Sequence, residues 1–275
     1  MKPRLLMGLK VLYMALHFVV MVFPLYWIVI TSLKPQKDIF SFPIRYWPER
    51  FTFENYTQIF KISKFHIYIG NSLLISVISA LIVLAIAILS GYVMARFQFR
   101  GHKQIMMAFF STQMLPGFIA LAPLYLLMAD LELINNRMSL VIAYTVMLIP
   151  FSTIMLRSFF QRIPSSLEEA AMIDGCSRLT ALIRVIIPIM LPGIASTFIF
   201  AFVQNWNELF MAVMFIDDDA LKTIPVAMNS FVMKFDVDWG AMSAGTVLSI
   251  LPTIVLFAFA QRFIVEGLTQ GAEKG

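Results

Sequence analysis

Residues 69–95, IGNSLLISVISALIVLAIAILSGYVMA, decide the fold, because this stretch carries no charged side chain. A helix needs about 20 apolar residues to cross the roughly 30 Å hydrocarbon core of a bilayer, so the stretch is long enough to span it. Five further runs have the same character: 11–30, 104–128, 138–160, 186–215 and 241–264. The sequence therefore predicts an all-α membrane protein with six transmembrane helices, forming one domain over residues 1–275.

The composition supports a membrane protein, with 60% hydrophobic and 13% charged residues. A soluble domain is nearer half apolar and a quarter charged. The first run has no small-residue cleavage site, so we interpret it as a retained helix rather than a signal peptide. The single cysteine, Cys176, excludes an internal disulfide and a cysteine metal cluster, and the three histidines lack metal-ligand spacing. We predict no metal site.

The distribution of basic residues predicts the orientation in the cell membrane. With the N-terminus inside, 12 of the 21 Lys and Arg residues fall in inner segments, and six of the other nine lie in one long outer loop, 34–64. Positive charge favours the cytoplasmic side, so the net charge of +5 does not indicate a nucleic-acid partner. We predict that both termini and the loop 161–188 are cytoplasmic. The prolines and aromatic residues of the long outer loop favour a packed loop or a short interfacial helix.

The loop 161–188 contains signals for the start and the end of a short helix. Ser165 with Glu168, or Ser166 with Glu169, would form a capping box. Gly175 suits the left-handed residue that follows a helix. Ser177 then predicts a second short helix, and prolines at 188 and 192 redirect the chain into the fifth span.

The predicted helix is amphipathic, because its apolar and acidic side chains fall on different arcs at about 100° per residue. Glu168 and Glu169 share one arc. The other arc holds Leu167, Ala170, Ala171 and Ile173. An ordinary amphipathic connector at the membrane surface would explain this pattern equally well.

The spacing of Glu169-Ala170-Ala171, Gly175 and Val185-x-Ile187-Pro188 resembles the signature of importer permeases of the ATP-binding-cassette (ABC) type. The family's tail reads Ile-x-Leu-Pro, so this chain departs conservatively at two positions. Motifs elsewhere are similar to the carbohydrate branch, specifically the smaller maltose-importer permease: Ser32-Leu33-Lys34-Pro35, Glu54-Asn55-Tyr56, Asn71-Ser72, Gly91-Tyr92, Ala95-Arg96-Phe97, Gly101, Pro123-Leu124-Tyr125, Trp206-Asn207-Glu208 and Gly267-Leu268-Thr269.

The resemblance implies a binding-protein-dependent importer of a sugar or oligosaccharide. Its partners would be a second permease subunit, two ATPase subunits that bind ATP and Mg, and an extracytoplasmic solute-binding protein. A coupling helix would insert into one ATPase. The ATPase-coupling residues implied are Glu168, Glu169, Ala170, Ala171, Asp174 and Gly175. This chain lacks a Gly-x4-Gly-Lys-Ser/Thr loop, so no cofactor is expected in it.

Two alternatives stay open beside the sugar importer. The first keeps the transporter class and changes the cargo. The second is a carrier driven by an ion gradient, a class that usually shows inverted repeats and more intramembrane charges than this sequence contains. No catalytic constellation indicates a membrane enzyme.

A polar group inside the fifth predicted span is the candidate for a substrate pathway. It consists of Gln204, Asn205, Asn207 and Glu208. An ionised Glu208 at mid-bilayer would cost roughly 3 kcal/mol, so it should face protein or water. On a continuous helix, Thr197, Gln204 and Glu208 would form a stripe. The stripe is either a pathway wall for sugar hydroxyls or a structural bond to a neighbouring span.

Overall fold

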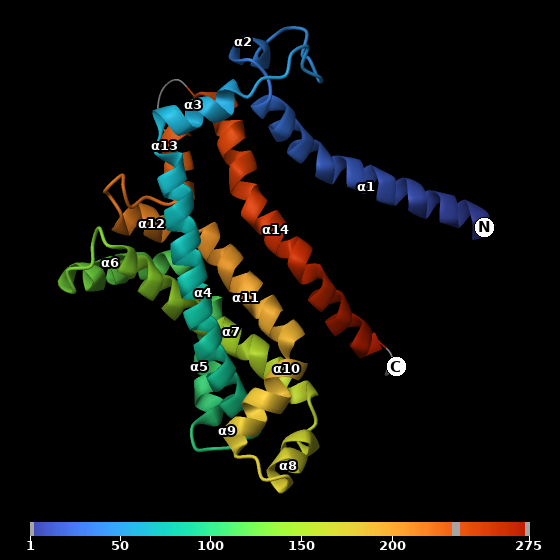
Figure 1. The fold of residues 1–275 in the computed structure, drawn as a ribbon, viewed down its shortest axis with the longest axis vertical. Coiled ribbons are helices and arrows are strands. Elements are labelled where there is room, and N and C mark those ends of the chain that lie inside the picture. Colours follow the sequence, from blue (N-terminus) through green and yellow to red (C-terminus); the bar gives the residue numbers. More distant parts are fainter. Residues whose placement is uncertain (1–2, 233–236, 273–275) are drawn as a thin grey trace. The chain divides into compact units, whose positions relative to one another are not determined.

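The computed structural model describes residues 3–232 and 237–272, and these residues form helices and loops without a strand (Figure 1). Four continuous helices are long and apolar enough to span a membrane: α1 (Pro3–Ser32), α4 (Phe65–Arg96), α7 (Arg137–Arg162) and α14 (Trp239–Ala272). Two bent helix pairs raise the count to six if each pair is one span. The predicted all-α membrane fold is confirmed.

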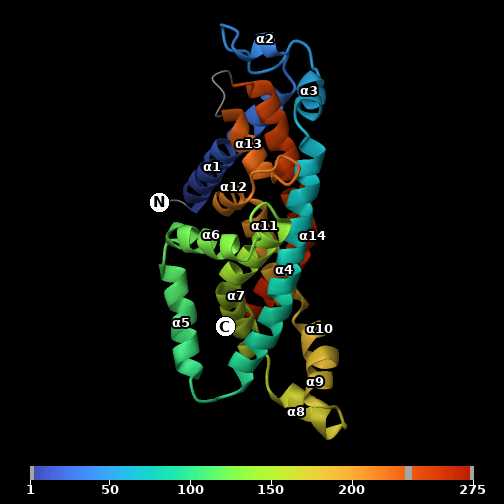
Figure 2. The ribbon, with the colours of Figure 1, turned by 90° about the vertical axis from the view of Figure 1, so that its left-hand side faces the viewer.

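The predicted span at 104–128 is not one straight helix. It consists of α5 (His102–Met114), the 3-10 turn η1 (Gly117–Ala120) and α6 (Leu121–Asp130), and the two arms meet at 100°. Figure 2 shows α5 and α6 nearly at a right angle. Leu115 and Pro116 at the corner are extended, because proline disfavours helical backbone in the residue before it and has no amide hydrogen to donate.

The predicted span at 186–215 is broken as well. It begins at the end of the π-helical turn η2 (Leu182–Ile186), which follows α9 (Arg178–Ala181). The chain continues through α10 (Ile187–Ile189) and then turns by 79° into α11 (Leu191–Trp206). A separate helix, α12 (Phe210–Phe215), follows after a gap. The predicted redirection of the chain near its prolines is confirmed here. In contrast, Pro150 and Pro252 remain inside the continuous helices α7 and α14.

The chain divides into two compact units, and residues 67–226 with 253–275 form the larger one. Its centre is α7, which buries 56% of its most apolar window. One half of α7 packs through Leu140 and Tyr144 in a cluster that includes Met211 and Phe215 of α12. The other half packs through Leu156 and Phe160 against α4, η2 and Met190. This core fixes the ends of α4 and α7 beside each other.

The smaller unit, residues 1–66 and 227–252, contains α1, α2 (Gln36–Ile39), α3 (Glu54–Ile62) and the first part of α14. Helix α13 (Ile224–Val232) spans the boundary between the units. The amide of Asn55 donates to the carbonyls of Ser32 and Lys34, each at 2.8 Å, and so ties α3 to the end of α1. The long loop is therefore packed and contains short helices, as predicted. Burial lowers the pKa of Lys34, whose ammonium donates to the carbonyl of Arg45.

Candidate coupling site

The predicted coupling helix is α8 (Ser166–Ile173), and its C-terminal end has the expected geometry. Gly175 has φ +89, in the left-handed region. The amide of Cys176 donates to the carbonyl of Ala171 (3.0 Å), and the amide of Gly175 donates to the carbonyl of Met172 (3.1 Å). This pair of bonds is the Schellman motif, which pairs carbonyls that a helix end leaves free. The predicted left-handed stop at Gly175 is confirmed.

The predicted capping box at the start of α8 is wrong. The residue before the helix is Ser165, so Ser166 already lies inside α8 and does not occupy the capping position. Ser165 has helical backbone angles, and its side chain makes no capping hydrogen bond. Glu168, which a box with Ser165 would require, is buried with 6% of its surface exposed. Its side chain turns toward α4 instead of back to the helix start.

Glu168 anchors α8 to the end of α4. Its Oε1 accepts from Arg96 Nε at 2.6 Å, and its Oε2 accepts from the hydroxyl of Tyr92 at 3.0 Å. Arg96 also donates from Nη2 to the carbonyl of Ile163, the residue after α7, at 2.8 Å. The ionic side chains are 13% and 8% exposed, so water screens this ion pair only weakly. These bonds therefore link α8 directly to the ends of α4 and α7.

The outward face of α8 is apolar and acidic. Ile173 is 86% exposed and Leu167 is 41% exposed, and Glu169, Ala170 and Asp174 are exposed beside them. A large apolar side chain so fully exposed at a helix tip, next to carboxylates, is a surface suited to a partner protein.

The structure divides the predicted coupling residues into two groups. Glu169, Ala170, Asp174 and Gly175 are exposed, whereas Glu168 and Ala171 are buried against the rest of the unit. Leu167 and Ile173 were absent from the predicted site, although the apolar arc already contained them. Tyr92 and Arg96 were also missed as members of the site; their occurrence in the resemblance motifs was the available signal.

The segment after α8 connects this helix to the core of the larger unit. Ser177 caps α9, because its Oγ accepts from the amide of Thr180 at 3.2 Å. The guanidinium of Arg178 lies over the ring of Phe97 at 5.0 Å. Leu182 and Ile186 then enter the core cluster around α7. The predicted second helix beginning after Ser177 is confirmed.

Glu208, the central residue of the predicted pathway, lies outside a continuous helix because α11 ends at Trp206. Its carboxylate accepts from the amides of Met211 (2.9 Å) and Ala212 (3.2 Å) at the start of α12. It also accepts from the hydroxyl of Tyr144 on α7 at 2.9 Å. The predicted stripe through Glu208 is therefore wrong, and the geometry favours the structural alternative.

The other three pathway candidates have different surroundings. Gln204 and Asn207 are exposed, and Asn207 Nδ2 donates to the carbonyl of Val203. Asn205 is buried, and its Nδ2 has no hydrogen-bond partner among the described residues. Trp206 is also buried, and its ring stacks on that of Phe202 with 5.5 Å between the ring centroids. These four polar side chains do not share one surface.

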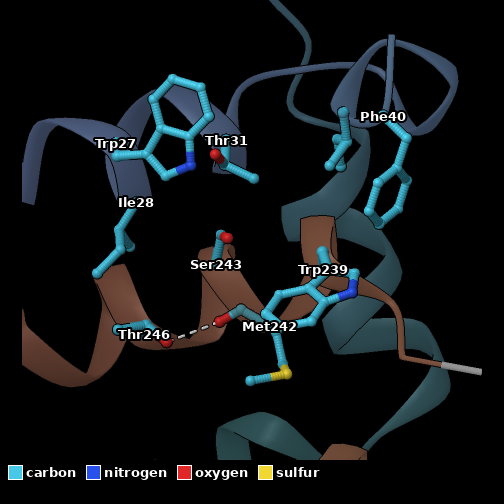
Figure 3. A pocket seen from close by; sticks show the side chains of 9 residues that line it. Trp27, Ile28, Thr31, Phe40, Trp239, Met242, Ser243 and Thr246 are labelled. Atoms are coloured by element: carbon cyan, nitrogen blue, oxygen red, sulfur yellow. Dashed lines mark hydrogen bonds between the residues drawn. The ribbon is translucent and has the colours of Figure 1, made fainter. Parts of the chain in front are cut away.

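A separate cavity of about 530 Å³ lies in the smaller unit (Figure 3). The rings of Trp27, Phe40 and Trp239 border the hydroxyl side chains of Thr31 and Ser243 in this view. No charged residue is among those lining it. The cavity therefore offers stacking surfaces and a few hydroxyls, a set that sequence reasoning did not identify. In the described part of the chain, no cluster of His, Cys, Asp and Glu is suited to a metal ion.

Residues 87–269, which contain α8 and the core around α7, match the family described as binding-protein-dependent transport system inner membrane component. The chain belongs to this family of transport permeases. It is therefore a multi-pass membrane protein that works in a binding-protein-dependent transport system.

Relatives resemble the permease along nearly its whole length. It is 36% identical to the diacetylchitobiose uptake system permease protein DasC of Streptomyces coelicolor, with 94% of each chain covered. It is 36% identical to the sulfoquinovosyl glycerol transport system permease protein SmoH of Agrobacterium fabrum, covering 92% of the permease and 89% of SmoH. The trehalose/maltose transport system permease protein MalG of Thermococcus litoralis is 30% identical, and the match covers 99% of the permease and 97% of MalG.

Solved structures support the fold. The permease superposes with a TM-score of 0.84 on a chain from a bacterial ABC transporter involved in the import of alginate, covering 95% of the permease and 97% of that chain. Their sequence identity is 20%, so this likeness concerns the fold.

Proposed function

We propose that the permease forms half of the translocation pathway of an ATP-driven importer for a sugar or oligosaccharide. The names of the relatives support this cargo, because they refer to diacetylchitobiose, sulfoquinovosyl glycerol, and trehalose or maltose. The partners are a second permease subunit, two ATPase subunits and an extracytoplasmic solute-binding protein. ATP and Mg bind to the ATPase partners, and the permease itself carries no cofactor.

The observation that carries the coupling part of this proposal is the two-sided construction of α8. Its outer face presents Ile173, Leu167 and Glu169, and its inner face is held by Glu168. An ATPase cleft grips the outer face, and Glu169 meets polar groups of that cleft. When ATP closes the ATPase pair, the buried ion pair transmits the displacement to α4 and α7, which shifts the population between inward-open and outward-open states.

This mechanism requires α8 and both termini on the cytoplasmic side, and the single cysteine provides a direct test. Cys176 lies immediately after Gly175 and is partly exposed. A membrane-impermeant maleimide should label Cys176 in inside-out vesicles and leave it unlabelled in right-side-out vesicles. Cys176→Ser is the control for nonspecific labelling. Labelling confined to right-side-out vesicles would place α8 on the wrong side for an ATPase.

Reconstitution tests the function itself. The permease is coexpressed with an ATPase, a second permease and a solute-binding protein from the same organism, and ATP hydrolysis is measured in liposomes. We expect hydrolysis to rise when the sugar-loaded binding protein is added, together with uptake of the sugar. Uptake by the permease alone, driven by an ion gradient without nucleotide, would favour the carrier alternative. Thermal shifts of the binding protein with sugars, amino acids and peptides separate the cargo classes.

A further inference from the structure

A basic cavity of about 830 Å³ lies in the larger unit, where the end of α4, the connector to α5 and the last two turns of α7 meet. Its cationic lining residues are Arg96, Lys103 and Arg157, with His102 beside them. Three neutral polar side chains, Gln98, Gln104 and Gln161, also line it. Most of the other lining side chains are apolar: Met94, Phe97, Phe99, Met106, Met107 and Phe110. The coupling mechanism uses only Arg96 from this set.

The cavity has an excess of positive charge. No Asp or Glu occurs in residues 55–129 or 137–162, which include the whole lining. Arg96 is neutralised by Glu168, but none of the ion pairs of the described residues includes Lys103 or Arg157. Arg157 is held in place by a bond from its Nε to the carbonyl of Met94 at 3.0 Å. A fixed guanidinium and a nearby ammonium without carboxylate partners favour an anionic ligand.

The apolar half of the cavity continues as an exposed surface. Met107 and Phe110 are 61% and 52% exposed, and Met114 farther along α5 is 83% exposed. A small inorganic anion would contact only the cationic half. A ligand that carries a phosphate on a hydrocarbon body would satisfy both halves.

The position along the helices is also that of a lipid headgroup. Arg96 is the last residue of α4, Lys103 is in the first turn of α5, and Arg157 is in the last two turns of α7. The cations therefore lie at the ends of apolar segments, where basic pockets between transmembrane helices bind anionic headgroups.

We propose that this cavity binds an anionic phospholipid, with the headgroup phosphate at Lys103 and Arg157 and the acyl chains along α5. One part of this proposal rests on the proposed function: the cytoplasmic position of α8 places the cavity at the cytoplasmic leaflet. The bound headgroup lies beside Arg96, so it adjoins the ion pair that holds α8. Lipid composition therefore affects how firmly α8 is coupled to α4.

The test uses the full-length permease in zwitterionic detergent, without ATP or partner subunits. Its unfolding temperature is titrated with phosphatidylglycerol, with phosphatidylcholine and with sodium phosphate. We expect phosphatidylglycerol alone to raise the unfolding temperature. An equal shift with phosphatidylcholine would overturn the need for a negative charge, and an equal shift with sodium phosphate would overturn a lipid as the ligand.

Variants locate the binding. Lys103→Gln and Arg157→Gln should each weaken the apparent affinity for phosphatidylglycerol by roughly fivefold, and Arg157→Lys should retain most of it. Lys103 is exposed, so its substitution leaves folding intact. The matched control is Arg100→Gln, which removes the same charge from the same connector outside the cavity lining. Equal losses in Arg100→Gln and Lys103→Gln would reduce the effect to net charge and overturn the site.

Binding to the isolated permease depends on neither nucleotide nor cargo. A failure of the importer assignment would therefore leave this result unchanged, and a failure of lipid binding would leave the coupling proposal intact.

Discussion

Arg96 Nε and Glu168 Oε1 lie 2.6 Å apart although 72 residues separate them in the chain. The pair joins the last residue of α4 to the first turn of α8, and both side chains are largely withdrawn from water. Breaking such a pair by removing one partner costs more than the pair contributes, because the remaining charge stays buried. The pair therefore attaches α8 to the end of the long apolar helix α4.

Glu168→Ala should destabilise the permease by about 3–5 kcal/mol, because Arg96 is left without its carboxylate. The measurement is thermal unfolding in detergent. The double variant Arg96→Ala/Glu168→Ala should lose less than the sum of the two single variants, as expected for residues in contact. Glu169→Ala is the matched control, since its exposed carboxylate should change stability by less than about 0.5 kcal/mol. Equal losses of stability in Glu168→Ala and Glu169→Ala would contradict a stabilising role of the buried ion pair.

Ile173→Asp should leave the permease folded and weaken its binding to the ATPase. The side chain is 86% exposed, so its substitution changes stability little, whereas a charge in the centre of an interface should weaken ATPase binding at least tenfold. Co-purification with the ATPase measures the effect. Leu179→Asp, on the neighbouring helix α9 and 60% exposed, is the control for a new acid in the same loop. If Leu179→Asp lost the ATPase and Ile173→Asp kept it, the outer face of α8 would not be the docking surface.

Gly175→Ala should destabilise the C-terminal end of α8 by about 1–2 kcal/mol, because a residue with a Cβ disfavours a φ of +89°. No heavy atom lies within 4 Å of the added Cβ, so the cost is one of backbone conformation alone. Gly175→Asn should be milder, since asparagine tolerates this region. Hydrogen exchange at the amides of residues 174–176 reports the change. Gly70→Ala, in helix α4 with equally open surroundings, is the control and should not loosen its helix.

Sequence reasoning succeeded where the cause is local. The stop at Gly175 follows from the conformational freedom of glycine, and the start of α9 follows from the capping hydroxyl of Ser177. It failed where the cause is a distant partner. On an isolated helix Glu168 belongs with Glu169, but Arg96 and Tyr92 turn it inward.

The large angles of the two bent spans could not be predicted, for a related reason. Hydropathy measures how many apolar residues follow one another but not their direction, so the corner at Pro116 was counted as part of one span. The same limit hid the end of α11 before Glu208. Some resemblance motifs now have a structural meaning. Asn71 donates to the carbonyls of Ala220 and Lys222, and the Oγ of Ser72 accepts from the amide of Ile224.

Glu208→Ala should destabilise the permease by about 1–2 kcal/mol, because it removes the acceptor for two amides in the first turn of α12 and the bond to Tyr144. Tyr144→Phe should cost about 1 kcal/mol through the lost hydroxyl. If Glu208 is structural, uptake in both variants follows the amount of folded protein, measured by thermal unfolding and by transport assays on matched samples. Glu208→Gln with normal stability and altered transport kinetics would restore the pathway hypothesis.

Asn55→Ala should weaken the smaller unit, because one amide group serves two backbone carbonyls there. Each carbonyl left unpaired in a buried site costs about 1–3 kcal/mol. Gly240→Ala should have a similar effect, since an added Cβ would lie within 3 Å of the side chains of Asn55 and Gln36. Limited proteolysis of residues 33–62 measures the loosening. Glu54→Ala, at an exposed neighbouring position, is the control, and the protease should cleave it at the same rate as the unsubstituted protein.

Asn55→Ala and Gly240→Ala should both retain the ATPase in co-purification, because α8 belongs to the other compact unit. Loss of the ATPase together with increased cleavage of residues 33–62 would show that docking depends on the packing around Asn55. That outcome would contradict the assignment of docking to the larger unit alone.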